Sequence, residues 1–171
     1  MQTWDAIRAR RNVRRYEDRP IDPADLDRIL EAGRRSPSSM NEQPWDFVVV
    51  TDRATCERLA KVWTYGGHIA GAAAAIALLS PSSDDPVARE TFAFDLGQAA
   101  MSMQLAAADL GIGSCHSAVG SQQDVRDVLG FAAERECVLI LSIGYPAGRP
   151  LRPVERPDRK AFADVVHRER W

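Results

Sequence analysis

Hydrophobic positions recur along the chain with two different spacings, which alternate up to about residue 145. Apolar residues three or four apart are typical of a helix with one buried face, and short continuous apolar runs are typical of buried strands. The predicted strands lie in "DFVVVT", "AAIALL" and "CVLILSIG". The last run is apolar at successive positions, so both faces are buried, and we expect a central strand there.

Capping residues and helical spacing predict five helices, two before the first of these strands and three after it. The first covers residues 4–13 and places Arg10 and Arg14 one turn apart. The helix over residues 86–110 is the longest, and its many alanines indicate close packing. The other three are predicted to begin at the N-cap residues Asp22, Asp52 and Ser121.

The alternation of helices and strands, taken alone, predicts a doubly wound α/β domain with a parallel sheet. From Pro146 the composition changes. The stretch "PAGRPLRPVERPDRK" holds four prolines and five basic residues in fifteen positions. Such a segment cannot form a core of its own, so we expect it to lie extended on another surface.

Composition narrows the class of protein. A chain of 171 residues, 45% hydrophobic and 27% charged, fits one globular domain or one subunit of an intimate oligomer. The formal net charge of −2 argues against a nucleic-acid or membrane-surface role. The N-terminal "MQTWDAIRARR" has no apolar signal-peptide core, and Cys56, Cys115 and Cys137 show no CxxC or metal-like spacing. We therefore expect reduced thiols and a cytoplasmic location.

Several common catalytic motifs are missing. His68, His116 and His167 are scattered without HExxH, so no metal site is predicted, and neither GxSxG nor a phosphate-binding P-loop occurs. The stretch "GIGSCH" begins like a dinucleotide-binding loop. His116 stands at the place of its third glycine, however, and the stretch follows a helix rather than a strand, so that interpretation fails.

Two polar stretches are left as candidate sites. "RARRNVRRY", residues 8–16, is either a solvated helix end or an anion site, because guanidinium groups match phosphate oxygens in pairs. The arginine-rich tail is a candidate second wall of that site. "PSSMNEQPW", residues 37–45, is either a tight turn or a rigid polar loop for a planar heteroaromatic ligand. In the second case its polar contacts come from Ser38, Ser39, Asn41 and Gln43.

These stretches together resemble the FMN-dependent nitroreductase family. "RRNVRRY", "PSSMNEQPWDFVVV", "LAAADLGIG", "IGYPAG" and "RKAFADVVHRERW" occur in the order typical of that family and cover essentially the whole chain. The resemblance implies an α+β fold, with a mixed central sheet flanked by helices, and an interleaved homodimer with FMN in its interface. It also implies a domain over residues 1–153 and a C-terminal tail, residues 154–171, that docks on the partner subunit.

The resemblance also implies which residues contact FMN. These residues lie in four segments. In the C-terminal segment, Ala161 stands where the family usually has proline, which leaves the register of the tail open, so Arg156 is a further candidate for binding the phosphate. The implied cofactor-binding residues are Arg10, Arg11, Asn12 and Arg14; Pro37, Ser38, Ser39, Met40, Asn41 and Gln43 from the partner; His116, Ser117, Ala118 and Val119 near the flavin N5; and Arg156, Arg159 and Lys160.

The implied reaction is hydride transfer from NADH or NADPH through FMN N5 to a small electrophile such as a nitroaromatic or a quinone, with ping-pong kinetics. No single side chain is expected to be an essential acid or base, although His116 is a candidate. Cys115 is expected to be a buried apolar side chain rather than a nucleophile. A specialised flavin-using or flavin-cleaving enzyme of cofactor biosynthesis, a non-catalytic flavin-binding protein and a deazaflavin partner are alternatives.

Overall fold

A four-stranded sheet with helices on both faces forms the body of the protein. The computed structural model describes residues 1–171. The strands run in the order β1-β2-β4-β3, and every neighbouring pair is antiparallel. Their bounds are β1 Asp46–Val50, β2 Ala74–Pro81, β3 Gly113–Ser117 and β4 Arg135–Gly144. The strand predicted to be central, β4, lies between two others, as expected.

Five α-helices surround the sheet: α1 Thr3–Ala9, α2 Pro23–Arg34, α3 Arg53–Leu59, α4 Pro86–Asp109 and α5 Gln122–Leu129. Three short 3-10 turns, η1 Ser39–Asn41, η2 Gly66–Gly71 and η3 Phe162–Asp164, lie in the connections and the tail. The three predicted N-caps are confirmed. The side chains of Asp22, Asp52 and Ser121 each accept a hydrogen bond from a backbone N–H of the helix that follows.

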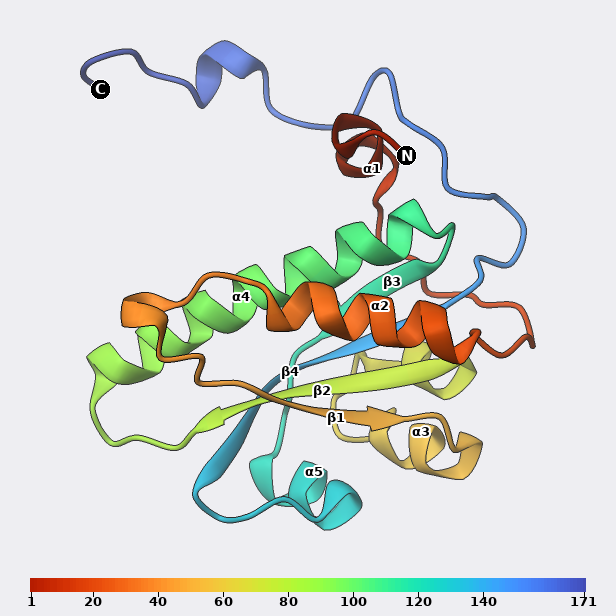
Figure 1. Ribbon diagram of the computed structural model, residues 1–171, viewed down its shortest axis with the longest axis vertical. Helices are drawn as coiled ribbons and strands as arrows, with labels where there is room; N and C mark the ends of the chain where they lie inside the picture. Colours follow the sequence, from red (N-terminus) through yellow and green to blue (C-terminus); the bar gives the residue numbers. More distant parts are fainter.

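Two separate hydrophobic cores lie on the two faces of the sheet. Helices α2 and α4 cover one face, and α3 and α5 cover the other (Figure 1). Alternate residues of β2 point into the two cores: Ile76 packs with Leu96 and Met103, whereas Ala77 packs on the side of Leu59. Because both faces are covered, β2 is buried along nearly its whole length.

The prediction of a doubly wound domain with a parallel sheet is wrong. Antiparallel strands usually show alternating polarity because one face meets water. Here helices cover both faces, so β2 and β4 show the continuous apolar runs that are typical of parallel strands. The α+β class implied by the family resemblance is confirmed. The mixed sheet that the resemblance implies is not seen within one chain: its four strands are all antiparallel, and its one parallel pairing is an isolated bridge between Asn12 and Ser114.

The first helix is shorter than predicted. It ends at Ala9, and residues 10–16 continue as extended chain along the sheet. The backbone N–H of Val13 donates to the carbonyl of Ser114 at 2.9 Å, and Tyr16 bridges to Pro146. Pairing with the start of β3 thus replaces helical hydrogen bonds, and Arg10 and Arg14 do not share a helix face.

The C-terminal tail leaves the body after β4. Residues 152–171 are all exposed, and they run past α1 and away from the sheet (Figure 1). Val154 N–H donates to the carbonyl of Arg8 at 3.2 Å, which fixes the first part of the tail beside α1. No helix of the chain has the length and apolar content that crossing a membrane requires.

Candidate functional site

A cavity rich in arginine lies between α1 and the tail. We call it the arginine cavity; its volume is 430 Å³. It brings together three predicted phosphate ligands, Arg10, Arg11 and Arg159, with Arg8 and Arg149. Glu155 and Asp158 are the acidic residues of its lining, so five guanidinium groups against two carboxylates give a formal charge of +3. The remaining lining residues are Trp4, Ile7, Val154 and Pro157.

The arginines of this cavity repel one another. Arg11 donates to the backbone carbonyl of Arg149, and its pKa is lowered by burial and then by the charge of Arg149. Arg8 forms an ion pair with Glu155. The carboxylates therefore offset only part of the positive charge, and a bound anion would relieve the repulsion between Arg11 and Arg149.

A second cavity, of 290 Å³, opens beside α4, and we call it the α4 cavity. Arg10 lines it as well as the arginine cavity, so the two cavities adjoin at this side chain. Arg10 Nη1 donates to Asn12 Oδ1 at 3.4 Å, and His116 of β3 lies on the same lining. The other lining residues are Gly97, Ala100, Met101, Gln104 and Leu139.

The loop of residues 37–43 is held in an unusual conformation. Met40, Asn41 and Gln43 have φ of 51°, 58° and 53°, which costs free energy in residues with a side chain. Three groups hold this conformation: Asp95 accepts the N–H of Ser39 at 3.0 Å, Ser38 Oγ accepts the N–H of Gln43, and Gln43 Nε2 donates to the carbonyl of Asn41.

The predicted ligand loop does not reach the other predicted residues within one chain. None of Pro37, Ser38, Ser39, Met40, Asn41 and Gln43 lines the arginine cavity or the α4 cavity. The loop projects near the start of α4, whereas α1 and the tail lie beyond the other end of that helix (Figure 1). Met40 at its tip is 92% exposed.

The predicted segment of residues 116–119 divides between two cavities. His116 is exposed in β3 and lines the α4 cavity, whereas Ala118 and Val119 line a separate 280 Å³ cavity with Ser80 and Cys137. Ser117 is buried, and its hydroxyl donates to the carbonyl of Ala118. Arg14, Arg156 and Lys160 line neither the arginine cavity nor the α4 cavity.

A buried polar network, not predicted from the sequence, lies under this region. His68 Nδ1 and the Tyr16 hydroxyl each lie 2.7 Å from Ser142 Oγ, and Tyr16 also donates to the carbonyl of Val13 at 2.6 Å. Burial lowers the pKa of His68, and the charges of Arg14 and His116 lower it further. A serine inside the apolar strand "CVLILSIG" was the sequence signal for this network.

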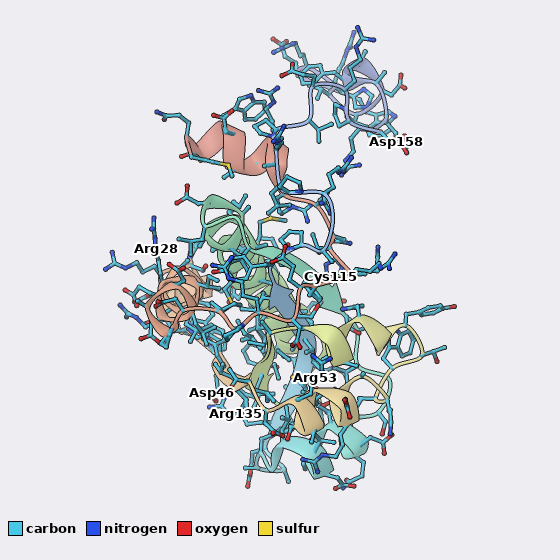
Figure 2. The ribbon with its side chains drawn as sticks, turned by 90° about the vertical axis from the view of Figure 1, so that its right-hand side faces the viewer. Arg28, Asp46, Arg53, Cys115, Arg135 and Asp158 are labelled. Atoms are coloured by element: carbon cyan, nitrogen blue, oxygen red, sulfur yellow. The ribbon has the colours of Figure 1, made fainter.

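Cys115 is not suited to act as a nucleophile. Its side chain is fully buried in the interior (Figure 2), and burial raises the pKa of its thiol. The thiolate is the nucleophilic form of cysteine, so a raised pKa disfavours reaction. These observations agree with the expected role as a small apolar side chain.

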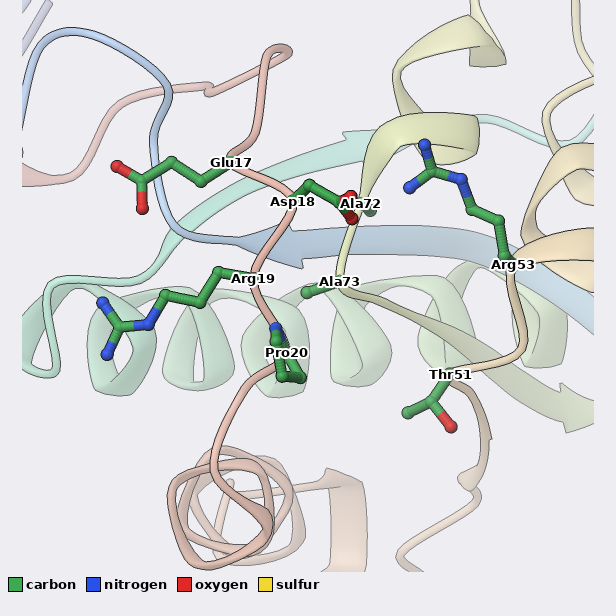
Figure 3. Close-up of a pocket in the computed structure, with 8 residues that line it drawn as sticks. All are labelled: Glu17, Asp18, Arg19, Pro20, Thr51, Arg53, Ala72 and Ala73. Atoms are coloured by element: carbon green, nitrogen blue, oxygen red, sulfur yellow. The ribbon is translucent and has the colours of Figure 1, made fainter.

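A further cavity of 350 Å³ lies where β1 ends and β2 begins, and none of the predicted site residues lines it. Figure 3 shows Arg19 and Arg53 on opposite sides of the Ala72–Ala73 backbone. Arg19 stacks on the ring of Tyr145, with its guanidinium carbon 3.8 Å from the ring centroid. Glu17 and Asp18 also line this cavity, so two carboxylates offset its two guanidinium groups, and it is a weaker anion site than the arginine cavity.

The fold is that of an α+β protein with a positively charged cavity, and comparison with known proteins gives its family. The nitroreductase family profile matches residues 7–65 and 62–145. A protein provisionally named NADH dehydrogenase/NAD(P)H nitroreductase, from Archaeoglobus fulgidus, is 32% identical over 96% of each chain. One of the same provisional name from Methanothermobacter thermautotrophicus is 32% identical over 100% of this chain and 88% of its own.

A solved structure supports the same conclusion. The FMN-dependent nitroreductase from Clostridium difficile R20291 superimposes with a TM-score of 0.85 at 26% identity, over 97% of this chain and 98% of its own. The chain belongs to the nitroreductase family. The family resemblance, the enzyme class (an oxidoreductase) and the α+β fold inferred from the sequence are confirmed.

Proposed function

We propose that the protein is a homodimeric, FMN-dependent oxidoreductase that passes hydride from NADH or NADPH to a small electrophile such as a nitroaromatic or a quinone. The observation that carries the proposal is the arginine cavity with its formal charge of +3, joined through Arg10 to a less charged cavity. FMN has a phosphate at one end and an uncharged polyol and ring beyond it, so its chemistry matches this sequence of environments.

The residues present fit FMN. The guanidinium groups of Arg10, Arg11 and Arg159 converge where a phosphate can accept several charge-assisted hydrogen bonds. In the α4 cavity the side-chain amide nitrogen of Gln104 is buried with no hydrogen-bond partner in the chain. Buried polar groups in native proteins are nearly always paired, so an acceptor on a ligand is expected there.

The other predicted contacts belong to the same proposal. Arg14 and His116 reach the flavin ring, together with the segment that continues to Val119. Arg156 and Lys160 approach the phosphate once the tail is docked. The loop of residues 37–43 reaches the flavin from the partner subunit, which its strained, braced conformation and its distance from both cavities support.

FMN held by these residues would supply the redox chemistry, the ping-pong transfer of a hydride from the nicotinamide to the acceptor through N5. The protein binds and orients the cofactor through its arginines, and it shapes the pocket for donor and acceptor. We assign no side chain the role of essential acid or base, and His116 is the side chain placed to assist proton delivery from water.

A homodimer accounts for apolar side chains that one chain leaves exposed. Val87, Phe94 and Met101 form a stripe along α4 and are 67%, 68% and 45% exposed. In the tail, Phe162 and Trp171 are 72% and 99% exposed. We infer that residues 1–153 form the domain and that residues 154–171 dock on the partner subunit. Three free, buried cysteines support a reducing, cytoplasmic setting.

Identifying the cofactor that leaves the denatured protein tests this proposal. We expect a yellow protein that releases FMN, measured by mass spectrometry, because the cavities offer one cationic region and no dinucleotide-binding motif. Release of FAD, or a colourless protein that FMN does not reconstitute, would contradict it. Extensive dialysis before denaturation removes flavin that is bound nonspecifically.

A further inference from the structure

Gln104 is a polar side chain near the C-terminal end of the long helix α4, and its amide nitrogen is unpaired. It lies on α4, is only 4% exposed and lines the α4 cavity. Its Nε2 atom is buried with no hydrogen-bond partner in the chain. Leaving an amide buried and unpaired is costly, and an apolar side chain of the same size would avoid that cost. The position therefore indicates an acceptor that the isolated chain lacks.

The surroundings of Gln104 have room for a ligand. Gly97, Ala100, Met101 and Gln104 follow the i, i+3, i+4, i+7 spacing and so line one side of α4. A Cβ at Gly97 would meet no heavy atom within 4 Å, so the wall is open there. Asn12 lies on the same lining and adds a second neutral amide.

Because Arg10 lines both cavities, it indicates which end of FMN lies in each of them. With the phosphate among the arginines, the part of FMN that follows must pass Arg10 to enter the α4 cavity. That part is the ribityl chain, whose hydroxyl oxygens accept hydrogen bonds from neutral amides. Charged arginines suit the phosphate, and the amides of Gln104 and Asn12 suit the hydroxyls.

We propose that Gln104 is a flavin-binding residue, whose Nε2 donates a hydrogen bond to a hydroxyl oxygen of the ribityl chain. This inference rests on the proposed function and adds a contact from α4, which none of the motifs in the sequence indicated. Gln104 completes its hydrogen bonding only in the cofactor-bound protein. The flavin-free protein carries an unpaired buried amide, which the bound protein does not.

The test compares Gln104→Leu with the matched control Ser102→Ala. Ser102 lies two residues away on α4, and its hydroxyl is already paired with Gln98 and Ser36, so its loss should leave flavin binding unchanged. Flavin-free protein is titrated with FMN and with riboflavin, which share the ribityl chain. The release rate of FMN from the holoprotein is measured on dilution.

For Gln104→Leu we expect the Kd for both flavins to rise about fivefold to a hundredfold, which corresponds to one lost hydrogen bond to a buried group. FMN release should accelerate by a similar factor. The melting temperature of the flavin-free variant should equal or exceed that of the wild type, because the unpaired amide is gone. Ser102→Ala should change neither Kd nor release rate by more than about twofold.

Three results would overturn the inference. Equal Kd values for wild type and Gln104→Leu would remove Gln104 from the flavin site while leaving the proposed function intact. A lower melting temperature and a weaker dimer with unchanged Kd would place its acceptor on the partner subunit instead. A wild-type protein that binds no flavin would reject the proposed function, and this inference with it.

Discussion

Arg10 occupies the position on which the account of the site depends, because its side chain lines both the arginine cavity and the α4 cavity. It therefore lies between a strongly cationic region and a less charged one. Removing this side chain should therefore affect binding of the phosphate and the placement of everything beyond it.

Arg10→Ala should weaken FMN binding about tenfold to a hundredfold, because a hydrogen bond to a charged group contributes about 1.5–3 kcal/mol. Titration of flavin-free protein with FMN measures the change. Arg35→Ala is the matched control, since Arg35 is exposed at the C-terminal end of α2, lines neither cavity and pairs with Glu31. If Arg10→Ala and Arg35→Ala bind FMN with the same Kd, the arginines of residues 8–16 are solvated surface residues and not phosphate ligands.

His68 should make the stability of the protein depend on pH. Its folded pKa is lowered, chiefly by burial, so the unfolded chain binds a proton that the folded protein excludes. Stability is then full above the unfolded pKa of about 6.5 and falls as the pH drops toward the lower folded value. Urea denaturation from about pH 7.5 to about pH 5.5 measures this decline.

His68→Asn is the comparison variant for that experiment. Its side-chain amide can occupy the place of Nδ1 beside Ser142 Oγ without titrating in this range. We expect the variant to lose less stability than the wild type on the same acidification. If both proteins lose the same amount, His68 is not the source of the pH dependence.

At the residue scale the sequence indicated the arginine cavity better than the rest of the proposed site. A cluster of arginines can be recognised without knowing the fold, and the structure brings Arg10, Arg11 and Arg159 together. Gln104 and the His68–Ser142 pair were missed. A single glutamine or serine in an apolar stretch shows no unusual spacing, and only the fold reveals whether it has a partner.

At the scale of elements, starts and ends of helices followed local chemistry where capping residues were present, as at Asp22 and Ser121. The end of α1 did not. Residues 10–16 are arginine-rich and compatible with a helix, but pairing of Val13 with Ser114 of β3 competes successfully. Strand direction could not be predicted from the sequence either, because strands buried on both faces show the same continuous apolar runs whether they are antiparallel or parallel.

The loop of residues 37–43 depends on one buried carboxylate of α4. Asp95 is 1% exposed and accepts the N–H of Ser39 with both oxygens, at 3.0 and 3.2 Å. Asp95→Ala leaves that donor without its partner, and we expect the free energy of unfolding to fall by about 1–3 kcal/mol. FMN affinity should fall as well, because the loop loses its brace.

Asp95→Asn is the control, since its amide oxygen still accepts the Ser39 N–H and should retain most of the stability. Urea denaturation and FMN titration of the three proteins give both quantities. If Asp95→Ala and Asp95→Asn bind FMN as tightly as the wild type, the conformation of this loop has no part in cofactor binding.

At the scale of the whole molecule, the exposed tail and the apolar stripe on α4 are the surfaces that the proposed homodimer would cover. A chain that ends at Arg152 should lose both dimerisation and retained flavin, because it lacks Arg159 and the apolar residues of the tail. Size-exclusion chromatography with light scattering gives the mass, and absorbance gives the bound flavin. A monomeric full-length protein, or a truncated dimer that keeps its flavin, would contradict the inferred assembly.

The most direct test of the central claim is anaerobic stopped-flow mixing of the purified holoprotein with NADH and, separately, with NADPH. We predict that at least one nicotinamide removes the visible flavin absorbance in a single turnover, and that a nitroaromatic or a quinone added afterwards restores it. A bound flavin that neither nicotinamide reduces would contradict the account and would favour a flavin-binding protein without turnover or a deazaflavin-dependent enzyme.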